Sequence, residues 1–237
     1  MANTSKVIDL DRLARFKAKQ DAANAAKAGI VKPGGDFDIT EDGTISLYKA
    51  MGINSFTVSP SQAERGSTVA DVTVAWSLSK TPKSLTLDGE AQDTASKGTT
   101  LSGVNLKADK TYTLKATDAR NAVATRTADV AFRDKRHWWV AVSLDAVGVT
   151  DQIINQATGE LATQYSKTFT LNAAAGQHIY YAFPASWGTP RFFVGGFEGG
   201  FALLKTFDHK NASGATISYA VWKSTNAGLG NTTVEVK

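Results

Sequence analysis

The sequence predicts a mainly β protein in which two sandwich-like domains follow an N-terminal arm. Beyond residue 36, apolar and polar residues alternate in short runs, which is typical of strands with one buried face. Glycine, asparagine and aspartate recur between these runs, as expected of tight turns. An alanine-rich helical pattern is confined to the start of the chain. The content of 42% hydrophobic and 20% charged residues is that of a globular protein with a sizeable core.

The first expected element is a helix over residues 7–28. Alanine, the strongest helix former, is abundant there; acidic residues come early, basic residues come late, and Gly29 follows as a stop signal. The apolar positions form a thin stripe: Leu10, Leu13, Phe16, Ala23 and Ile30. A single helix with so narrow a stripe must pack against the body of its own protein or against further copies of itself. The seven-residue spacing along the stripe covers too few heptads to predict a coiled coil.

A β-hairpin is expected next, after a linker at residues 32–35. Phe37 and Ile39 alternate with polar residues, Asp42-Gly43 supplies the turn, and the alternation resumes at Ile45. A hairpin alone is marginal in water, so it must pack on the following domain or on neighbouring subunits. We therefore assign residues 1–51 to assembly and anchoring, through the apolar stripe together with Phe37 and Ile39.

Residues 52–133 have the pattern of an immunoglobulin-like β-sandwich. Val72, Val74 and Trp76 alternate strictly with small or polar residues, which places a tryptophan on one buried face. Further strands are expected at 56–58, 85–87, 112–116 and 123–132. The segment that ends in Tyr112 resembles a tyrosine corner, in which the phenol bonds back to the backbone at the start of a late strand.

Residues 134–237 are expected to form a second β-rich, sandwich-like domain. Strands are predicted at 138–142, 165–171, 179–183, 191–194, 217–222 and 232–236, with a short helical turn near 151–157. The glycine-rich run 194–201 lacks the spacing and the following helix of a dinucleotide-binding loop. We interpret it as close backbone packing, with Phe197 and Phe201 reaching the core.

The net charge is concentrated in the arm. Residues 1–35 hold seven basic and three acidic side chains and so carry the whole net charge of +4, whereas the remainder holds 19 of each sign. A charge-balanced body is not expected to bind nucleic acid. The basic arm either docks onto an acidic partner or is a solvated helix face. No apolar run approaches the ~20 residues of a membrane helix, and the start lacks the apolar segment of a signal peptide, so we expect synthesis in the cytoplasm without membrane insertion.

The sequence offers no constellation of catalytic or metal-binding residues. It has no cysteine, and its three histidines, at positions 137, 178 and 209, lack the spacing of metal ligands. The nucleophile-elbow and phosphate-loop motifs are absent. The candidate carboxylates of the C-terminal domain are Asp145, Asp151, Glu160, Glu198 and Asp208, and their spacing does not place two of them across a cleft. We expect a non-enzymatic protein with no cofactor and no metal.

Three tryptophans are the candidates for surface contact. Trp138 and Trp139 are neighbours on a predicted strand and must point to opposite faces of the sheet, so one can lie in the core while the other lies outside it. Trp187 falls in a predicted loop. An exposed tryptophan marks an interface or a platform for stacking a sugar ring. The alternative is that these rings seal the two domains together or pack a second sheet.

Four segments resemble tail, fibre and baseplate-associated proteins of bacteriophages and prophages of gut bacteria. They are LDRLARFKAKQD at residues 10–21, GDFDITEDGTI at 35–45, INSFTV at 53–58 and NAGLGNTT at 226–233, and they occur in order along nearly the whole chain. The resemblance rests on general likeness and on no catalytic motif.

The resemblance implies a virion structural protein, made in the host cytoplasm and released by lysis. The N-terminal helix and hairpin would anchor it to the particle and assemble it as a homotrimer, in contact with other virion proteins. The domains beyond would project toward the host, where a bacterial surface glycan is a candidate partner. Three alternatives stay open at this point: a carbohydrate-binding module that uses the tryptophans, a capsid or neck decoration protein without a receptor role, and a glycan-degrading enzyme that depends on Glu198.

Overall fold

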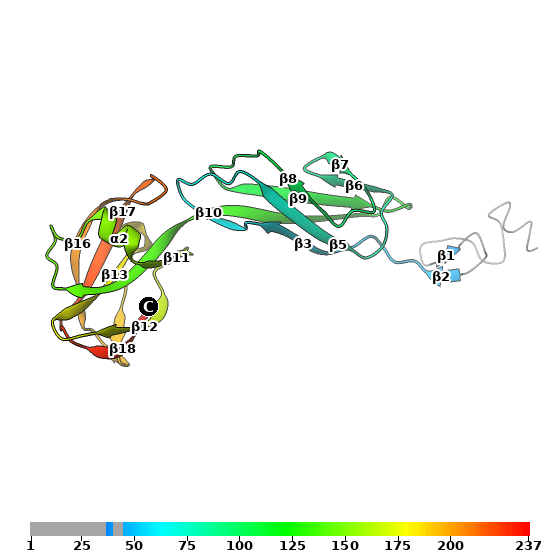
Figure 1. Ribbon diagram of the computed structural model, residues 1–237. Coiled ribbons are helices and arrows are strands. Elements are labelled where there is room, and N and C mark those ends of the chain that lie inside the picture. The colour runs from blue at the N-terminus through cyan, green and yellow to red at the C-terminus, as the bar shows by residue number, and fades with distance from the viewer. Residues whose placement is uncertain (1–36, 40–44) are drawn as a thin grey trace, which may run out of the picture.

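The computed structural model describes residues 37–39 and 45–237, which form a hairpin and two β-sandwiches arranged end to end (Figure 1). The predicted helix over residues 7–28 lies outside the described residues, as do its apolar positions Leu10, Leu13, Phe16, Ala23 and Ile30. Within the described part, no helix is long and apolar enough to cross a membrane.

The hairpin consists of β1 (Phe37–Ile39) and β2 (Ile45–Leu47). The two strands pair antiparallel with Phe37 opposite Leu47, as the alternation of apolar residues predicts. Of the hairpin side chains only that of Leu47 is described, and it is 75% exposed. An apolar side chain so exposed on a two-stranded sheet is a point where further packing would stabilise the hairpin.

The first sandwich has the strand order of an immunoglobulin-like domain. One sheet has three strands: β3 (Ile53–Ser59), β5 (Val72–Leu78) and β8 (Gly98–Leu101). The facing sheet has the order β7 (Glu90–Gln92), β6 (Ser84–Leu87), β9 (Lys110–Thr117) and the first half of β10 (Val123–Val142). β4 (Gln62–Glu64) lies parallel to β10. The chain crosses between the sheets from β5 to β6, from β7 to β8 and from β8 to β9, as in a Greek key.

The core of this sandwich follows from strict alternation. In β5, Val72, Val74 and Trp76 are buried while the residues between them are exposed. The indole nitrogen of Trp76 donates to the carbonyl of Ser96 at 2.8 Å, so this large ring is buried without leaving a polar group unpaired. Complete burial of an aliphatic side chain such as Leu114 stabilises the fold by about 1.5–3 kcal/mol.

The predicted tyrosine corner is only half realised. Tyr112 is 3% exposed and belongs to the core, but its phenol makes no hydrogen bond to another described residue. Asp109 instead makes the long-range bond at this corner, because its Oδ1 accepts from the backbone N–H of Phe132 at 2.6 Å. The hydrogen bond that was expected from the phenol is thus replaced by one to the carboxylate of Asp109, which directly precedes β9.

A single strand, β10, passes from one sandwich into the other. Its first half pairs with β9 from Val123 to Val130, and its second half pairs with the second sandwich from Asp134 to Val142. Its 20 residues span roughly 65 Å at the rise of an extended chain. The two domains are joined by continuous hydrogen-bonded strand, with no loop between them.

The second sandwich also packs two sheets face to face. The larger sheet combines β16 (Phe201–Lys210), β17 (Thr216–Ser224), β13 (Gln177–Pro184), the second half of β10 and β11 (Thr158–Ala162). The smaller sheet has the order β12 (Lys167–Ala173), β18 (Gly230–Val236), β14 (Phe192–Val194) and β15 (Phe197–Glu198). The short helices α2 (Asp151–Gln156) and η1 (Ala185–Trp187) complete this domain.

The central strand β13 is buried on both faces. Tyr181 and Phe183 point into the core between the two sheets, whereas Tyr180 and Ala182 point into a second core. That second core is closed by Ile154 of α2 and by Val149 of the preceding loop. Double burial explains why β13 is a continuous apolar run instead of an alternating one.

Two expectations for this domain are corrected by the structure. The strand β16 falls within and after the glycine-rich run and was not among the predicted strands. Phe201 packs against the inter-sheet core as expected, but the prediction that Phe197 reaches the core is wrong, since its side chain is 81% exposed. The reason is geometric: β15 is a two-residue edge strand that pairs only with β14 among the described strands.

Candidate functional site

The neighbouring tryptophans of β10 lie on opposite faces of the larger sheet, as predicted. Trp138 stacks on Phe169 with ring centroids 5.7 Å apart, toward the inter-sheet core. Trp139 stacks on Tyr180 at 5.1 Å, toward the core beneath α2. Both are partly buried, and each has a protein ring against it. They therefore pack two different cores.

Trp187 lies in η1 and stacks on Phe183 at 6.2 Å, again toward the inter-sheet core. It too is partly buried. Its ring faces inward onto Phe183, so the position is not the freely projecting platform that the loop prediction suggests. A glycan contact at any of the three tryptophans stays a prediction.

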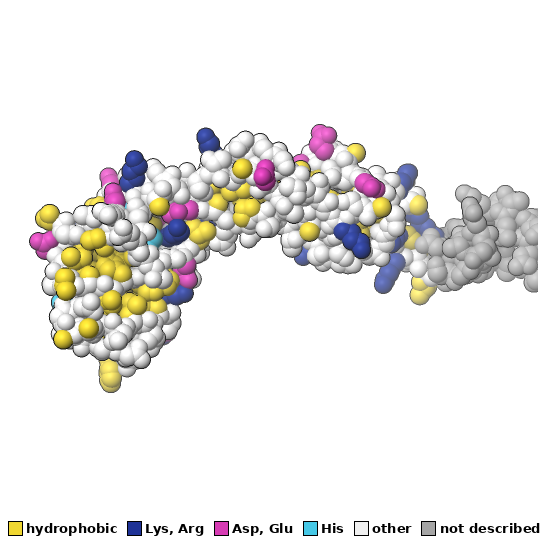
Figure 2. Space-filling model, viewed as in Figure 1, with side chains coloured by type: hydrophobic (Ala, Val, Ile, Leu, Met, Phe, Trp, Pro, Cys, Tyr) yellow, Lys and Arg dark blue, Asp and Glu magenta, His cyan; other side chains and the backbone are white. Residues whose placement is uncertain are grey.

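The exposed apolar side chains of the second sandwich are Val142, Val147, Phe197 and Leu203. Figure 2 shows hydrophobic side chains gathered over the visible face of this domain and scattered more thinly over the first sandwich. Exposed apolar groups that gather on one domain are typical of contact surfaces.

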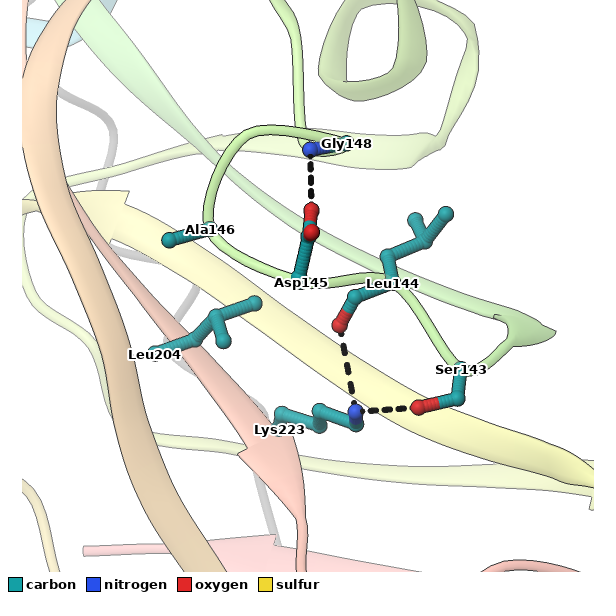
Figure 3. A pocket seen from close by; sticks show the side chains of 7 residues that line it. All are labelled: Ser143, Leu144, Asp145, Ala146, Gly148, Leu204 and Lys223. Carbon is teal, nitrogen blue, oxygen red and sulfur yellow. Dashed lines mark hydrogen bonds between the residues drawn. The ribbon is translucent and has the colours of Figure 1, made fainter.

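A shallow pocket of about 420 Å³ lies on the second sandwich, between the loop that follows β10 and the strands β16 and β17 (Figure 3). It is lined by Ser143, Leu144, Asp145, Ala146, Gly148, Leu204 and Lys223. The ammonium of Lys223 donates to Ser143 Oγ at 2.7 Å and to the carbonyl of Leu144 at 3.1 Å. Asp145 Oδ1 accepts from the N–H of Gly148 at 2.7 Å. The polar groups thus stabilise their own loop and do not converge on a common point.

The carboxylates singled out in the sequence occupy separate structural positions. Asp151 bonds to His209, Glu160 pairs with Arg136 and Lys167, and Glu198 pairs with Arg191 at 2.5 Å. Burial raises the pKa of Glu160, but the hydrogen bonds and ion pairs with Lys167 and Arg136 together outweigh it and lower the pKa. Among the described residues, no three histidines or carboxylates gather as a metal site would require.

At the end of the first sandwich nearest the hairpin, Tyr48 is held by a charged clamp. Its phenol donates to Asp118 Oδ2 at 2.8 Å, and the ammonium of Lys80 reaches the same oxygen at 2.8 Å. The Lys80 and Arg120 side chains lie against the Tyr48 ring, at 4.6 Å and 4.3 Å from its centroid. Lys80 also donates to the carbonyl of Lys49.

Asp118 is the centre of this clamp. The backbone N–H groups of Arg120 and Ala122 both donate to its Oδ1 at 2.9 Å. The hydrogen bond from Lys80, above all, holds the pKa of Asp118 well below its usual range, and the bonds from Tyr48 and the backbone add to this effect against burial. The clamp fixes the direction in which the chain enters the sandwich from the N-terminal side.

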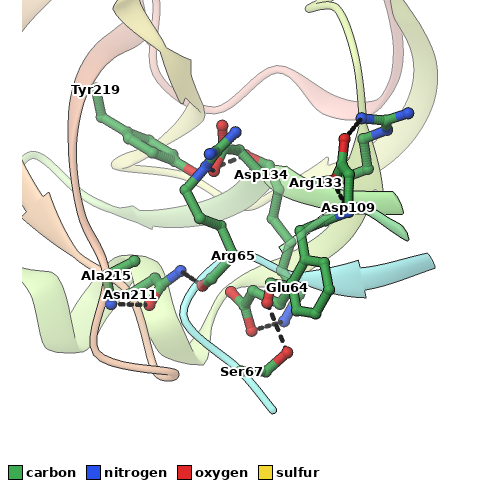
Figure 4. Close-up of polar contacts among 11 residues, drawn as sticks. Glu64, Arg65, Ser67, Asp109, Arg133, Asp134, Asn211, Ala215 and Tyr219 are labelled. Carbon is green, nitrogen blue, oxygen red and sulfur yellow. Dashed lines mark hydrogen bonds and ion pairs between the residues drawn. The ribbon is translucent and has the colours of Figure 1, made fainter. Parts of the chain in front are cut away.

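A second polar cluster, which we call the joint, lies where the two sandwiches meet (Figure 4). Lys135 pairs with Glu64 at 3.0 Å, and Arg65 pairs with Asp134 at 2.9 Å. Both pairs connect β10 with the segment that begins in β4. The two pairs therefore hold the first sandwich to β10 at the point where β10 passes into the second sandwich.

The turn between β16 and β17, residues 211–215, completes the joint from the second sandwich. Asn211 donates to the carbonyl of Arg65 at 2.8 Å, and Ser213 bonds to Glu64 Oε2 at 3.1 Å. Gly66 packs so closely on this turn that a Cβ there would lie 2.8 Å from the backbone nitrogen of Ala215. The joint is thus a contact between two domains in which part-buried polar groups are paired across the boundary.

Beneath the joint lies a group of buried rings formed by His137, His209 and Tyr219. The His137 ring centroid is 6.3 Å from that of His209 and 6.2 Å from that of Tyr219. Tyr219 donates to the carbonyl of Lys135 at 2.7 Å, and His209 Nδ1 bonds to Asp151 Oδ1 at 2.8 Å. Burial, above all, raises the pKa of Tyr219.

The sequence signals for these residues were weak. The carboxylate of Asp118 is buried, and no local sequence pattern indicates this. The partners in the joint are up to 149 residues apart along the chain, in the case of Ser213 and Glu64. His137 and His209 are buried in the second sandwich, and their isolated positions in the sequence do not indicate this burial.

No protein-family model and no curated protein matches this sequence. Among solved structures, the chain is similar to the N-terminal eight immunoglobulin domains of Down Syndrome Cell Adhesion Molecule isoform 1.30.30. The identity is 10% and the TM-score 0.24, with 83% of this chain and 29% of that chain covered. It is also similar to chitinase ChiA74 from Bacillus thuringiensis, at 12% identity and a TM-score of 0.22, with 78% of this chain and 26% of that chain covered. The chain thus spans less than a third of either structure, and at these scores neither likeness bears on its function.

Proposed function

We propose that the chain is a virion structural protein of a bacteriophage, assembled as an oligomeric appendage such as a tail fibre or baseplate projection. Residues 1–51 serve assembly and anchoring, and the second sandwich contacts the host surface. The resemblance of the four segments to tail, fibre and baseplate-associated proteins supports this class.

The observation that carries the proposal is the continuous strand β10. A strand shared by two sandwiches, braced by the joint, makes a stiff elongated body without a hinge loop. In Figure 1 the hairpin lies at one end of this body and the second sandwich at the other. Such a body suits a projection, because a contact made at its far end is held at a fixed distance and angle from its base.

Assembly from several copies, which is part of this proposal, would strengthen attachment. Weak contacts between individual second sandwiches and a surface add up when the copies are held together, and avidity then exceeds the single affinity by roughly 10²–10⁴. The exposed apolar side chains of this domain are the candidates for those contacts.

The test is the mass of the full-length chain in solution, by light scattering coupled to size-exclusion chromatography. We expect three times the 25.2 kDa of one chain. The double variant Leu10→Asp and Phe16→Asp should reduce the mass to that of one chain, because charges on the stripe oppose its burial. A matched variant on the polar side of the predicted helix, Arg15→Asp, should leave the trimer intact. A monomer at every concentration would contradict self-assembly and favour a decoration protein or an independent binding module.

A further inference from the structure

His137 is a buried imidazole without a compensating charge. It is 4% exposed, and its Nδ1 makes no hydrogen bond to the rest of the described chain. The backbone of Gly159 on β11 closes over this nitrogen, since a Cβ at that position would lie 2.6 Å from it. A proton placed on Nδ1 would therefore meet the α-carbon of a glycine and no acceptor.

The neighbouring His209 also has one ring nitrogen, Nε2, that makes no hydrogen bond to the described chain, but it differs from His137 in having a carboxylate partner. His209 is fully buried, but its Nδ1 bonds to the carboxylate of Asp151 at 2.8 Å, so a positive charge on its ring has a partner. The charged and titratable groups packed around the two rings come from five elements: Asp134 and Lys135 of β10, Glu64 of β4, Tyr219 of β17, Asp151 of α2 and His209 of β16 itself. From β11 and β13, the residues opposite His137 are the uncharged Gly159 and Ala182.

The two histidines lie under the joint. His137 follows Lys135 by two residues on β10, and Lys135 pairs with Glu64 of the first sandwich. His209 precedes Asn211 by two residues, and Asn211 donates to the backbone of Arg65. Tyr219 contacts both rings and is bonded to the carbonyl of Lys135. A change in the charge or position of the His137 ring therefore affects both β10 at Lys135 and turn 211–215, the two parts that contact the first sandwich.

We propose that His137 makes the joint sensitive to pH: at neutral pH the neutral ring lets turn 211–215 stay docked on the first sandwich, and protonation in acid releases it. The two sandwiches are then held at one angle near neutrality and vary in angle in acid, while each keeps its own core.

The direction follows from proton linkage. Burial first, and then the nearby His209 and Lys135, lower the pKa of His137 from 6.5 to about 4, against a backbone hydrogen bond at Ala157. In an open form where water reaches the ring, the histidine binds a proton near its ordinary pKa. Above a pH of about 6.5, the docked form therefore has its full stability relative to the open form. This stability decreases as the pH falls from about 6.5 to about 4. The loss approaches about tenfold in the docking equilibrium for each pH unit.

The test measures the angle between the sandwiches directly. The chain has no cysteine, so Lys107→Cys in the first sandwich and Thr168→Cys in the second give two unique sites for spin labels, both on exposed side chains. We expect a narrow distribution of label distances at about pH 7.5 and a broad one at about pH 4.5, with the change spread over the interval in which histidine charging occurs. A distribution that stays narrow throughout overturns the proposal.

The variant His137→Gln removes the titrating ring and should keep the distribution narrow at about pH 4.5. The matched control is His178→Gln on β13. The imidazole of His178 bonds to the carbonyl of Ser224, away from the joint. In this variant the distance distribution should broaden in acid as it does in the parent. Equal broadening in parent and His137→Gln would assign the effect to other groups, such as the carboxylates of the joint, and would overturn the proposal.

A measurement on the unsubstituted chain guards against a variant that folds poorly. By NMR, the Cε1–H of His137 and the amides of turn 211–215 should titrate with a common midpoint, while amides in the core of the first sandwich stay unchanged. Separate midpoints for the ring and the turn would count decisively against the proposal.

Discussion

At the scale of single residues, glycine and buried charge determine how closely the parts of this chain approach one another. Gly66 has a left-handed backbone with φ of +89° and packs on turn 211–215, where a Cβ would lie 2.8 Å from Ala215 N. Gly103 has a similar φ of +69° but nothing within 4 Å of its would-be Cβ. The two positions separate the effect of backbone strain from that of a steric clash.

We therefore expect Gly66→Ala to destabilise the protein more than Gly103→Ala. The left-handed backbone alone costs about 1–2 kcal/mol for a residue with a Cβ, which applies to both variants. The clash with Ala215 adds about 1–3 kcal/mol at Gly66 only. Urea unfolding, monitored by tryptophan fluorescence, measures the free energy of unfolding of both variants. An equal loss of stability in the two variants would mean that the joint tolerates a Cβ at Gly66.

Asp118 should make stability depend on acid. Because the bond from Lys80 and its other donors hold the pKa of Asp118 below the ordinary value, the folded state keeps this carboxylate charged where the unfolded state does not. Its contribution is complete above the unfolded pKa of about 3.9 and is lost as the pH falls further. In Asp118→Asn, stability at neutral pH should be lower, and its decline below about pH 4 should be shallower than in the parent.

Thermal unfolding across this pH range checks the prediction. The exposed Asp129 of β10 offers the matched control, and Asp129→Asn should leave both the neutral stability and the acid decline near those of the parent. An acid decline in Asp118→Asn as steep as in the parent would show that the clamp is not its source.

At the scale of elements, the turn between β16 and β17 is the part that most depends on its partner domain. Asn211 is 5% exposed; its side chain donates to Arg65 O at 2.8 Å and accepts from Ala215 N at 2.9 Å. Loss of two such bonds costs about 1–3 kcal/mol when their partners stay buried.

Asn211→Ala should therefore release the turn while both cores persist. Hydrogen exchange read by mass spectrometry should show faster exchange in residues 211–215 and in the segment of Arg65, with the core strand β5 unchanged. Thr216→Ala, an exposed change at the start of β17, should have no such effect. Faster exchange across both sandwiches would indicate global destabilisation and not a local role.

The strands differ in how well their local sequence predicts them. β5 alternates strictly and was predicted with its burial pattern, because one of its faces lies on the core and the other in water. β13 reads as a continuous apolar run because it is covered twice, yet it was also predicted as a strand. β16 was missed because four glycines precede it and its alternation is broken by a bulge between Leu203 and Lys205.

At the scale of the whole molecule, the body should keep its shape without the arm. The clamp around Tyr48, both cores and the joint all lie within residues 48–237. A chain that begins at residue 47 should therefore be a folded monomer with the elongated scattering profile calculated from the two described sandwiches. Small-angle X-ray scattering at neutral pH tests this; a profile of two freely moving domains would contradict the rigid joint.

Many structural features of this protein are determined by residues that are close together in the chain. The sequence by itself determined the mainly β class, a hairpin with Phe37 and Ile39 on its first strand, the alternating core of β5, and the placement of Trp138 and Trp139 on opposite faces. Each of these depends on strand periodicity or on the φ preference of a turn residue, so a window of a few residues carries the information.

The functional features were decided only in three dimensions. Nothing local distinguishes Arg65 and Asn211, 146 residues apart, from ordinary surface residues; they become the joint when β10 brings the two sandwiches into contact. The same holds for Asp118 beneath Tyr48, for His137 closed in by Gly159, and for Phe197, which an edge strand leaves in water. Burial and pairing across such distances depend on the packing of whole sheets, and sheet packing is a property of the folded chain rather than of any segment of its sequence.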